Sequence, residues 1–345
     1  MTASEQRADR SFRELVDLCH EAGWTDGLPV IPPEAELVEE MLAGKSPGEI
    51  VAVLDPGRGV ATMEKAAANA VMAGCRPDAF PAVLAALRAV AEERFEAEAL
   101  LTSLHSSSPL LVVHGDYADR IGMNGDNGAL GPGNRANATV GRAVQLCLRN
   151  LAGARPDRLA PKTLGHPGGY TYCFAENRTL SPWDPLHIDR GFDSTSSAVT
   201  VYGADAPLCV ADMGRTDPEL ILRTIVESIS IPGTYNAFFR QELWLIMTPE
   251  HAVAIADAGW SKRDVQNWIH RHAVMPAGRL RDRGLYGFID SAVRPRWIED
   301  AAADQTIALT KSPDSVVIVV AGGALGGYTA VVFGVGRSVT KEIDE

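Results

Sequence analysis

Apolar residues recur along much of the chain at the spacing of one helix face. The clearest case covers residues 138–151, where apolar side chains fall at i, i+3, i+4, i+7, i+8 and i+11. The same spacing predicts a helix over residues 11–22. Helix-forming composition and helix start and stop residues predict six more, over residues 34–42, 63–73, 78–93, 218–228, 249–257 and 263–272.

Short, continuous apolar runs alternate with these helical stretches and are typical of buried strands. They cover residues 109–114, 198–202, 243–247, 315–320 and 328–333. The glycine-rich residues 322–327 are interpreted as a structural turn between the last two strands. Helices that alternate with buried strands predict an α/β fold, with a mixed sheet and helices packed on it.

No linker or break in composition divides the chain, so we expect one large α/β domain over residues 11–340 after a flexible N-terminus, 1–10. A division into two lobes would fall near 193–197. Residues 73–78 (AGCRPD) and 152–157 (AGARPD) echo each other where two predicted helices end. The echo indicates an internal duplication, and the alternative is helix-stop chemistry that both segments share.

Composition narrows the classes of protein to consider. The formal net charge of −12 would repel phosphate backbones, which excludes nucleic acid as the expected partner. No apolar run approaches the roughly 18 residues of a membrane span, and the polar start of the chain resembles no signal peptide. The five scattered cysteines contain no Cys-x-x-Cys pair and fit a reducing compartment. We therefore expect a cytoplasmic protein that acts on small molecules.

A loop rich in glycine and asparagine leads directly into the clearest helix. Residues 124–139 contain four glycines, and Asn124, Asn134, Arg135 and Asn137 bring amide and guanidinium donors to the start of that helix. Such donors, together with the N–H groups of a helix start, favour a bound anion, so these four residues are predicted to bind substrate. The alternative is a glycine-rich turn in which Asn137 caps the helix. No nucleotide-binding signature is present.

The second candidate segment, 166–192, combines aromatic side chains with acidic, basic and thiol groups. This mixture is expected where a substrate is held and protons are moved. Glu176 and His187 are the predicted acid/base residues, and Asn177 and Arg190 are predicted to bind substrate. The alternative is a set of ordinary loop ion pairs, in which Arg190 neutralises a neighbouring aspartate, Asp184 or Asp189.

The same segment also contains side chains with atoms that can ligate a metal. They are His166, Glu176, Asp184, His187 and Asp189. Their spacing matches neither a His-Glu-x-x-His helix nor a paired-cysteine zinc site. We therefore predict no metal and no cofactor, and keep a divalent metal as the alternative.

Two smaller features complete the candidates. Cys75 follows the end of a predicted helix, where the dipole disfavours a thiolate and Arg76 partly opposes that effect. It is kept as a catalytic candidate, and the alternative is a buried structural thiol. Thr62 and Lys65 lie one turn apart at a helix start and are predicted to hold a carboxylate, unless Lys65 is a solvated side chain beside Glu64.

Five short motifs stand out along the chain: residues 26–33 (DGLPVIPP), 69–75 (NAVMAGC), 131–139 (GPGNRANAT), 174–177 (FAEN) and 181–183 (SPW). Together they resemble a poorly characterised bacterial family, whose members often occur fused to, or beside, a small domain with a selenocysteine-Gly-Ser-Cys motif. The resemblance extends over residues 26–340 and identifies no catalytic residue. This chain has no Cys-Gly-Ser-Cys motif, so the resemblance implies a separate thiol or selenol partner subunit.

Three hypotheses about function follow. The first is an enzyme, or the substrate-binding catalytic subunit of one, that acts on a small polar or anionic organic substrate by acid/base chemistry. A lyase, hydratase or hydrolase is favoured over an oxidoreductase. The second is a subunit of a thiol- or selenol-dependent redox complex, and the third is a non-catalytic ligand-binding or scaffolding subunit. We expect a homo- or hetero-oligomer.

Overall fold

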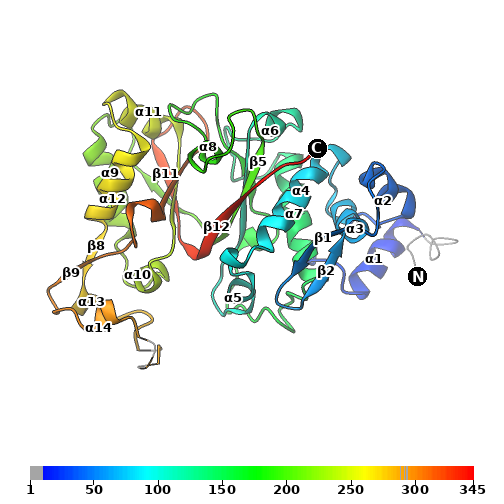
Figure 1. Cartoon of the computed structure of the whole chain (residues 1–345), viewed down its shortest axis with the longest axis horizontal. Coiled ribbons are helices and arrows are strands. Elements are labelled where there is room, and N and C mark those ends of the chain that lie inside the picture. The colour runs from blue at the N-terminus through cyan, green and yellow to red at the C-terminus, as the bar shows by residue number, and fades with distance from the viewer. Residues whose placement is uncertain (1–10, 288, 291, 293) are drawn as a thin grey trace. The chain divides into compact units, whose positions relative to one another are not determined.

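The computed structural model describes residues 11–345 except 288, 291 and 293, so the expected flexible N-terminus lies outside the described residues. It confirms the α/β class, with helices and mixed parallel and antiparallel sheets (Figure 1). Unit 1 comprises the chain up to Ala175 with 187–203 and 338–345, and unit 2 comprises 176–186 and 204–337. The position suggested for a division, 193–197, lies inside unit 1.

Unit 1 contains the N-terminal helices. They are α1 (Phe12–Glu21), α2 (Ala35–Leu42), α3 (Met63–Ala73), α4 (Phe80–Val90), α5 (Ala97–Thr102), α6 (Asp116–Arg120) and α7 (Arg135–Asn150). A hairpin, β1 (Ile50–Leu54) and β2 (Gly59–Thr62), is antiparallel. The larger sheet has the order β12-β5-β3-β4. Its strands are β3 (Ser108–His114), β4 (Cys173–Ala175), β5 (Ala198–Ala204) and β12 (Gly334–Glu342).

The core of unit 1 forms around the middle of this sheet. Every residue of β3 and β5 is buried, as expected for continuous apolar strands covered on both faces. Helix α7 packs against α3, α4 and β4, and Figure 1 shows α4 and α7 side by side. Because β3 and β4 are parallel, their carboxyl ends meet at one edge of the sheet.

An ion pair ties α7 to the loop that precedes α2. Arg142 of α7 donates two 2.8 Å hydrogen bonds to the carboxylate of Asp26, and its guanidinium also reaches the carbonyls of Leu28 and Pro29. A bidentate pair of this kind sets both distance and orientation. The proline-rich loop is therefore attached to the helix by polar contacts.

Unit 2 has its own four-stranded sheet, in the order β10-β7-β11-β6. Strands β10 (Val316–Val320) and β7 (Leu243–Met247) are parallel, whereas β11 (Tyr328–Val332) is antiparallel to β7 and to β6 (Leu208–Ala211). A small antiparallel pair joins β8 (Val274–Pro276) and β9 (Thr306–Ala308). The helices are α9 (Pro218–Ile229), α10 (Asn236–Phe239), α11 (Pro249–Asp257), α12 (Lys262–His272), α13 (Ala277–Arg281) and α14 (Arg296–Glu299). Helix α8 (Leu186–Asp189) spans the limit between the units.

The predicted helices and strands are present, but some begin or end at other residues than predicted. Helix α7 begins at Arg135, three residues earlier than the apolar face indicated, because polar residues form its first turn. The predicted helix 78–93 is α4 flanked by short 3-10 turns. Strand β7 lies between β10 and β11, so residues 322–327 connect two strands that are not neighbours.

Seven of the described strands were not predicted from the sequence, and most of them are short or polar. These are β1, β2, β4, β6, β8, β9 and β12, of which only β1 is an apolar run of five residues. Several have only three or four residues, too few for a period to show, and β12 carries glycine, arginine and lysine. Helices α3 and α7, which end in the two similar segments, pack together, and the internal duplication stays a prediction.

We predict that Gly141→Ala destabilises unit 1. A Cβ at this position of α7 would lie 2.5 Å from the Thr171 hydroxyl and 2.9 Å from the Cys173 Cβ. In an open helix this change gains about 1 kcal/mol, but overpacking against β4 costs about 1 to 3 kcal/mol, so a net loss is expected. Urea unfolding measures the free energy, and Gly48→Ala, with no atom within 4 Å, is the matched control. An unchanged free energy in Gly141→Ala would refute the close packing of α7 on β4.

His251, in the first turn of α11, is a buried histidine of unit 2. Its Nε2 lies 2.9 Å from the carbonyl of Asp212, so this nitrogen carries the proton and donates it. Its Nδ1, 2.9 Å from the Thr329 hydroxyl, is then the acceptor. Burial lowers the pKa of His251, and the Asp212 carbonyl and the charges of Asp212 and Glu250 oppose that shift. The native state therefore holds a neutral imidazole.

Unit 2 should lose stability in acid through His251. The pKa of the imidazole is near 6.5 in the unfolded chain and lower in the folded protein. The neutral imidazole therefore makes its full contribution to the free energy of unfolding above about pH 6.5. That contribution falls as the pH drops toward the pKa of the folded state, by at most about 1.4 kcal/mol per pH unit. His251→Gln, whose amide can donate and accept, should remove this part of the loss. Urea unfolding at pH 7.5 and 5.5 measures it, with His20→Gln, an exposed position, as control. Equal acid losses in wild type and His251→Gln would contradict the assignment.

Candidate functional site

The start of α7 is held by the side chain of Asn134. Its Oδ1 accepts a 2.9 Å hydrogen bond from the Asn137 amide, and its Nδ2 donates to the Gly122 carbonyl at 2.8 Å. Within the described chain, the backbone N–H groups of Arg135 and Ala136 donate no hydrogen bond to another residue. These two N–H groups remain for a ligand, as at other helix starts.

Asn124 and Asn137 hold the glycine-rich loop against the helix. The Asn137 side chain accepts from the Asn124 amide at 2.9 Å and donates to the carbonyls of Asn124 and Ala129 at 2.8 and 3.3 Å. The Asn124 side chain in turn closes on the backbone of Asp126 and Asn127. Asn134 caps the helix, and not Asn137 as considered from the sequence. The side-chain amides of Asn124, Asn134 and Asn137, which were predicted to bind substrate, form hydrogen bonds with the backbone of the loop and the helix start.

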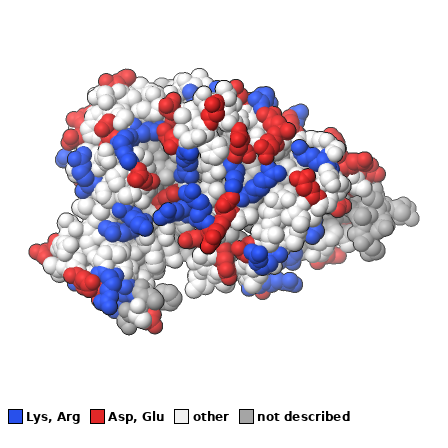
Figure 2. All heavy atoms as spheres, viewed as in Figure 1, with Lys and Arg blue, Asp and Glu red and all other residues white. Residues whose placement is uncertain are grey.

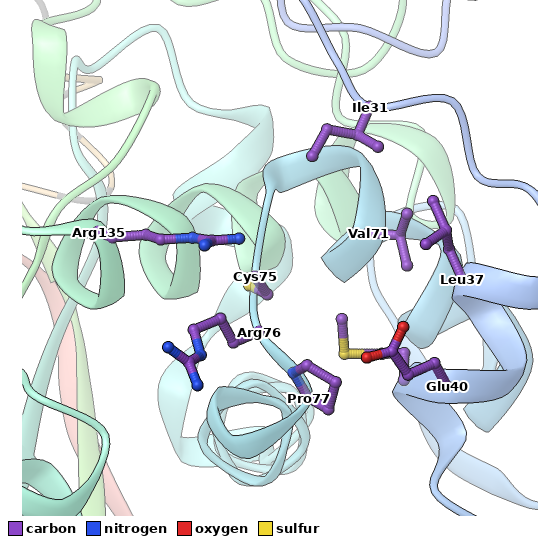
Figure 3. Close-up of a pocket in the computed structure, with 9 residues that line it drawn as sticks. Ile31, Leu37, Glu40, Val71, Cys75, Arg76, Pro77 and Arg135 are labelled. Atoms are coloured by element: carbon purple, nitrogen blue, oxygen red, sulfur yellow. The ribbon is translucent and has the colours of Figure 1, made fainter.

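Arg135 joins the start of α7 to the end of α3. Its Nε and Nη2 donate to the carbonyl of Gly74 at 3.1 and 3.0 Å. Gly74 ends α3 in the left-handed conformation, at φ 88°, which suits glycine. The Nη1 group takes no part in these two bonds. Figure 3 shows the side chain extending from α7 toward Cys75.

Two pockets in unit 1 share Arg76 and Arg135. The first, here named the Cys75 pocket, has a volume of about 300 Å³. It is lined by Ile31, Leu37, Glu40, Met41, Val71, Cys75, Arg76, Pro77 and Arg135 (Figure 3). The second, the α7 pocket, has a volume of about 200 Å³. It is lined by Arg76, Asp78, Ala79, Ile121, Gly122, Asn134, Arg135, Ala136 and Thr139.

Each pocket has more positive than negative side chains in its lining. Both contain the two guanidinium groups, and each has one carboxylate, Glu40 in the Cys75 pocket and Asp78 in the α7 pocket. Arg76 Nε lies 3.6 Å from Asp78 Oδ1, so this carboxylate is partly compensated. Elsewhere, on the face shown in Figure 2, acidic and basic side chains are interspersed. A local excess of positive charge on an acidic protein favours an anionic ligand.

Cys75 lines its pocket as a protonated thiol. It is 7 % exposed, and burial raises its pKa to about 12, against the smaller opposing effects of the nearby Thr139 hydroxyl and the charge of Arg135. Near neutral pH the thiolate, which is the nucleophile, is scarce. The structure therefore gives Cys75 the character of a lining residue, and the predicted catalytic role would need a base that removes its proton.

His187 belongs to a buried network at the carboxyl end of β3. Its ring stacks on that of His114 at 5.5 Å between centroids, and both histidines are buried. His114 Nε2 lies 2.9 Å from the Thr200 hydroxyl, which lies 2.9 Å from that of Thr340. Sequence reasoning missed His114, although it is a polar residue at the end of an apolar strand, and the carboxyl ends of strands are where open α/β sheets bind ligands.

Arg190 fastens α8 to β12. It donates to the carbonyl and hydroxyl of Ser338, at 3.2 and 2.5 Å, and to the Thr340 hydroxyl at 3.3 Å. The sequence predicts that Arg190 binds substrate or pairs with Asp184 or Asp189. The three hydrogen bonds to β12 show in addition that Arg190 stabilises unit 1, which the sequence did not indicate.

Glu176 and Asn177 lie at the start of unit 2. Glu176 is buried, and its Oε2 accepts from the Leu186 amide at 3.0 Å. The Asn177 backbone N–H donates to the Val320 carbonyl at 2.8 Å, and its side chain donates to the Gly322 carbonyl and accepts from a loop amide. His187 belongs to unit 1, so neither unit contains both predicted acid/base residues.

Thr62 and Lys65 build the junction between β2 and α3. The Thr62 hydroxyl caps α3 by accepting from the Lys65 amide at 3.3 Å, and Lys65 Nζ donates to the Val60 carbonyl at 3.2 Å. Carboxylate binding here stays a prediction. Among the described residues, no three His, Cys, Asp or Glu side chains come together as a set of metal ligands.

Comparison with known protein families finds no matching family model, and comparison with curated proteins finds no match. None of the described helices is both long enough and apolar enough to cross a membrane.

The state of Cys75 predicts its reactivity toward alkylating reagents. Because its thiol is buried and its pKa is about 12, Cys75 should react with iodoacetamide at pH 7.5 at least about tenfold more slowly than the exposed Cys209 of the same chain. Peptide mass spectrometry over time measures both rates in the native protein. In urea the two rates should converge, and a fast native reaction at Cys75 would instead indicate an activated thiol.

Proposed function

We propose that this chain binds a small organic anion at Arg76 and Arg135 and converts it by acid/base chemistry, as a lyase, hydratase or hydrolase. The observation that carries the proposal is the pair of pockets that share these two guanidinium groups beside the N–H groups of Arg135 and Ala136. Guanidinium forks and backbone N–H groups are the donors that carboxylates and phosphates prefer.

Preorganisation supports the binding role. The position of Arg135 is set by two hydrogen bonds to Gly74, and the loop before α7 is held by Asn124, Asn134 and Asn137. Donors that are already in place cost less conformational entropy when a ligand binds. The asparagines thus act as positioning residues, and the arginines and backbone N–H groups contact the ligand.

For proton transfer we propose His187, supported by its stacking on His114. Histidine is the side chain that most often serves as a general acid or base, and the bond of His114 to Thr200 holds the stacked ring in place. Glu176, which lies in unit 2, stays a prediction from the sequence. The free cysteines are consistent with our proposal of a cytoplasmic enzyme.

The thiol- or selenol-dependent complex stays the alternative, favoured by one observation. The pKa of Cys75 is raised, so its own thiol is poorly suited to nucleophilic chemistry. A complex of this kind would need its reactive group from a partner subunit, as the family resemblance of the motifs implies. The chain would then bind the substrate and present it to that group.

Calorimetric titration with inorganic phosphate tests the anion site. We expect binding by the wild type and a loss of about tenfold or more in affinity in Arg76→Gln and in Arg135→Gln, because each removes a charge-assisted donor. Arg76 is the cleaner variant, since its side chain is largely exposed. Arg58→Gln, another exposed arginine outside both pockets, is the control. Absence of phosphate binding, or equal affinity in all variants, would overturn the proposal.

A further inference from the structure

We infer that the bound anion carries an apolar tail, which makes the ligand an organic acid with an aliphatic or aryl chain of several carbons. The inference rests on the proposed anion site and names its ligand class. It comes from the linings of the two pockets that share Arg76 and Arg135, because one includes an apolar wall from α2 and α3 and the other includes the start of α7.

The Cys75 pocket is mainly apolar on the side away from the arginines. Leu37 and Met41 of α2 and Val71 of α3 face it, and Met41 and Val71 are 3 % and 4 % exposed. Ile31 and Pro77 extend the same lining (Figure 3). A protonated, buried Cys75 behaves as a small apolar side chain, which keeps the floor of the pocket apolar.

The α7 pocket is lined by the first turn of α7, where the N–H groups of Arg135 and Ala136 donate no hydrogen bond within the described chain. These groups suit the oxygen atoms of a carboxylate. Apolar lining and a few placed polar groups are the usual make-up of a site for a small organic ligand.

The carboxylates set the direction in which a ligand lies. Glu40 lines the Cys75 pocket and would repel an anionic head there, whereas Asp78 in the α7 pocket is compensated by Arg76 at 3.6 Å. The head therefore belongs in the α7 pocket. The tail lies in the adjoining Cys75 pocket, which shares Arg76 and Arg135 with the α7 pocket, and contacts Leu37, Met41 and Val71 there.

A chain-length series tests this inference. Affinities for acetate, butanoate and hexanoate are measured by calorimetry beside that for inorganic phosphate. Full burial of one methylene raises the affinity at most about fourfold. Because the pocket is open to solvent, we expect each added methylene to raise the affinity about twofold from acetate to hexanoate. Leu37→Gln keeps a good helix former and should flatten the series without changing phosphate affinity. Val38→Gln, the next position of α2 and outside the pocket lining, should leave the series as in the wild type.

The outcomes separate the two proposals. Phosphate binding that depends on Arg76, with no gain from acetate to hexanoate, would overturn the apolar tail and leave the proposed function standing. A series that rises equally in wild type and Leu37→Gln would also overturn it. If neither phosphate nor any carboxylate binds, the anion site itself is wrong. Hexanoate binding that is unaffected by Arg76→Gln would overturn the placement of the head beside the arginines.

Discussion

The candidate site depends on the two hydrogen bonds from the Arg135 guanidinium to the carbonyl of Gly74. They connect the first residue of α7 with the residue that ends α3, so two helices far apart in sequence meet at one point. Gly74 takes the left-handed conformation there and has no Cβ, and the turn that follows presents Cys75 and Arg76 next to Arg135. This contact therefore holds Arg76 and Arg135 close together, so that both side chains line both pockets.

Polar groups near this contact divide into those that hold the backbone and those left for a ligand. The asparagine side chains of the loop are short and lie close to backbone carbonyls and amides, with which they form local hydrogen bonds. Asn124, Asn134 and Asn137 therefore bond to the loop. The arginines are longer and reach the pockets, and they retain donors after their structural bonds are made.

Buried polar side chains elsewhere follow the same rule. His251 in unit 2 lies between the Asp212 carbonyl and the Thr329 hydroxyl, which explains why its neutral form is native. His114 in unit 1 is bonded to Thr200 and stacks on His187. Both ring nitrogens of His251 thus have fixed hydrogen-bond partners. The rings of His114 and His187 instead lie together at the carboxyl end of a strand, where α/β proteins place their functional residues.

The sequence by itself determined the α/β class and the helices with a clear apolar face, such as α3, α7, α9 and α12, because burial of one face follows from a local period. It also located the polar helix entrance at Asn134 and Arg135. It did not show the division into two units, the strand β12, or the separation of Glu176 from His187, since each depends on residues distant in sequence. Only the tertiary structure decided that the loop asparagines bond to backbone and that Arg190 binds β12. It alone also placed Arg76 beside Arg135 and His114 beside His187, because hydrogen-bond partners and burial are set by segments that pack together after folding.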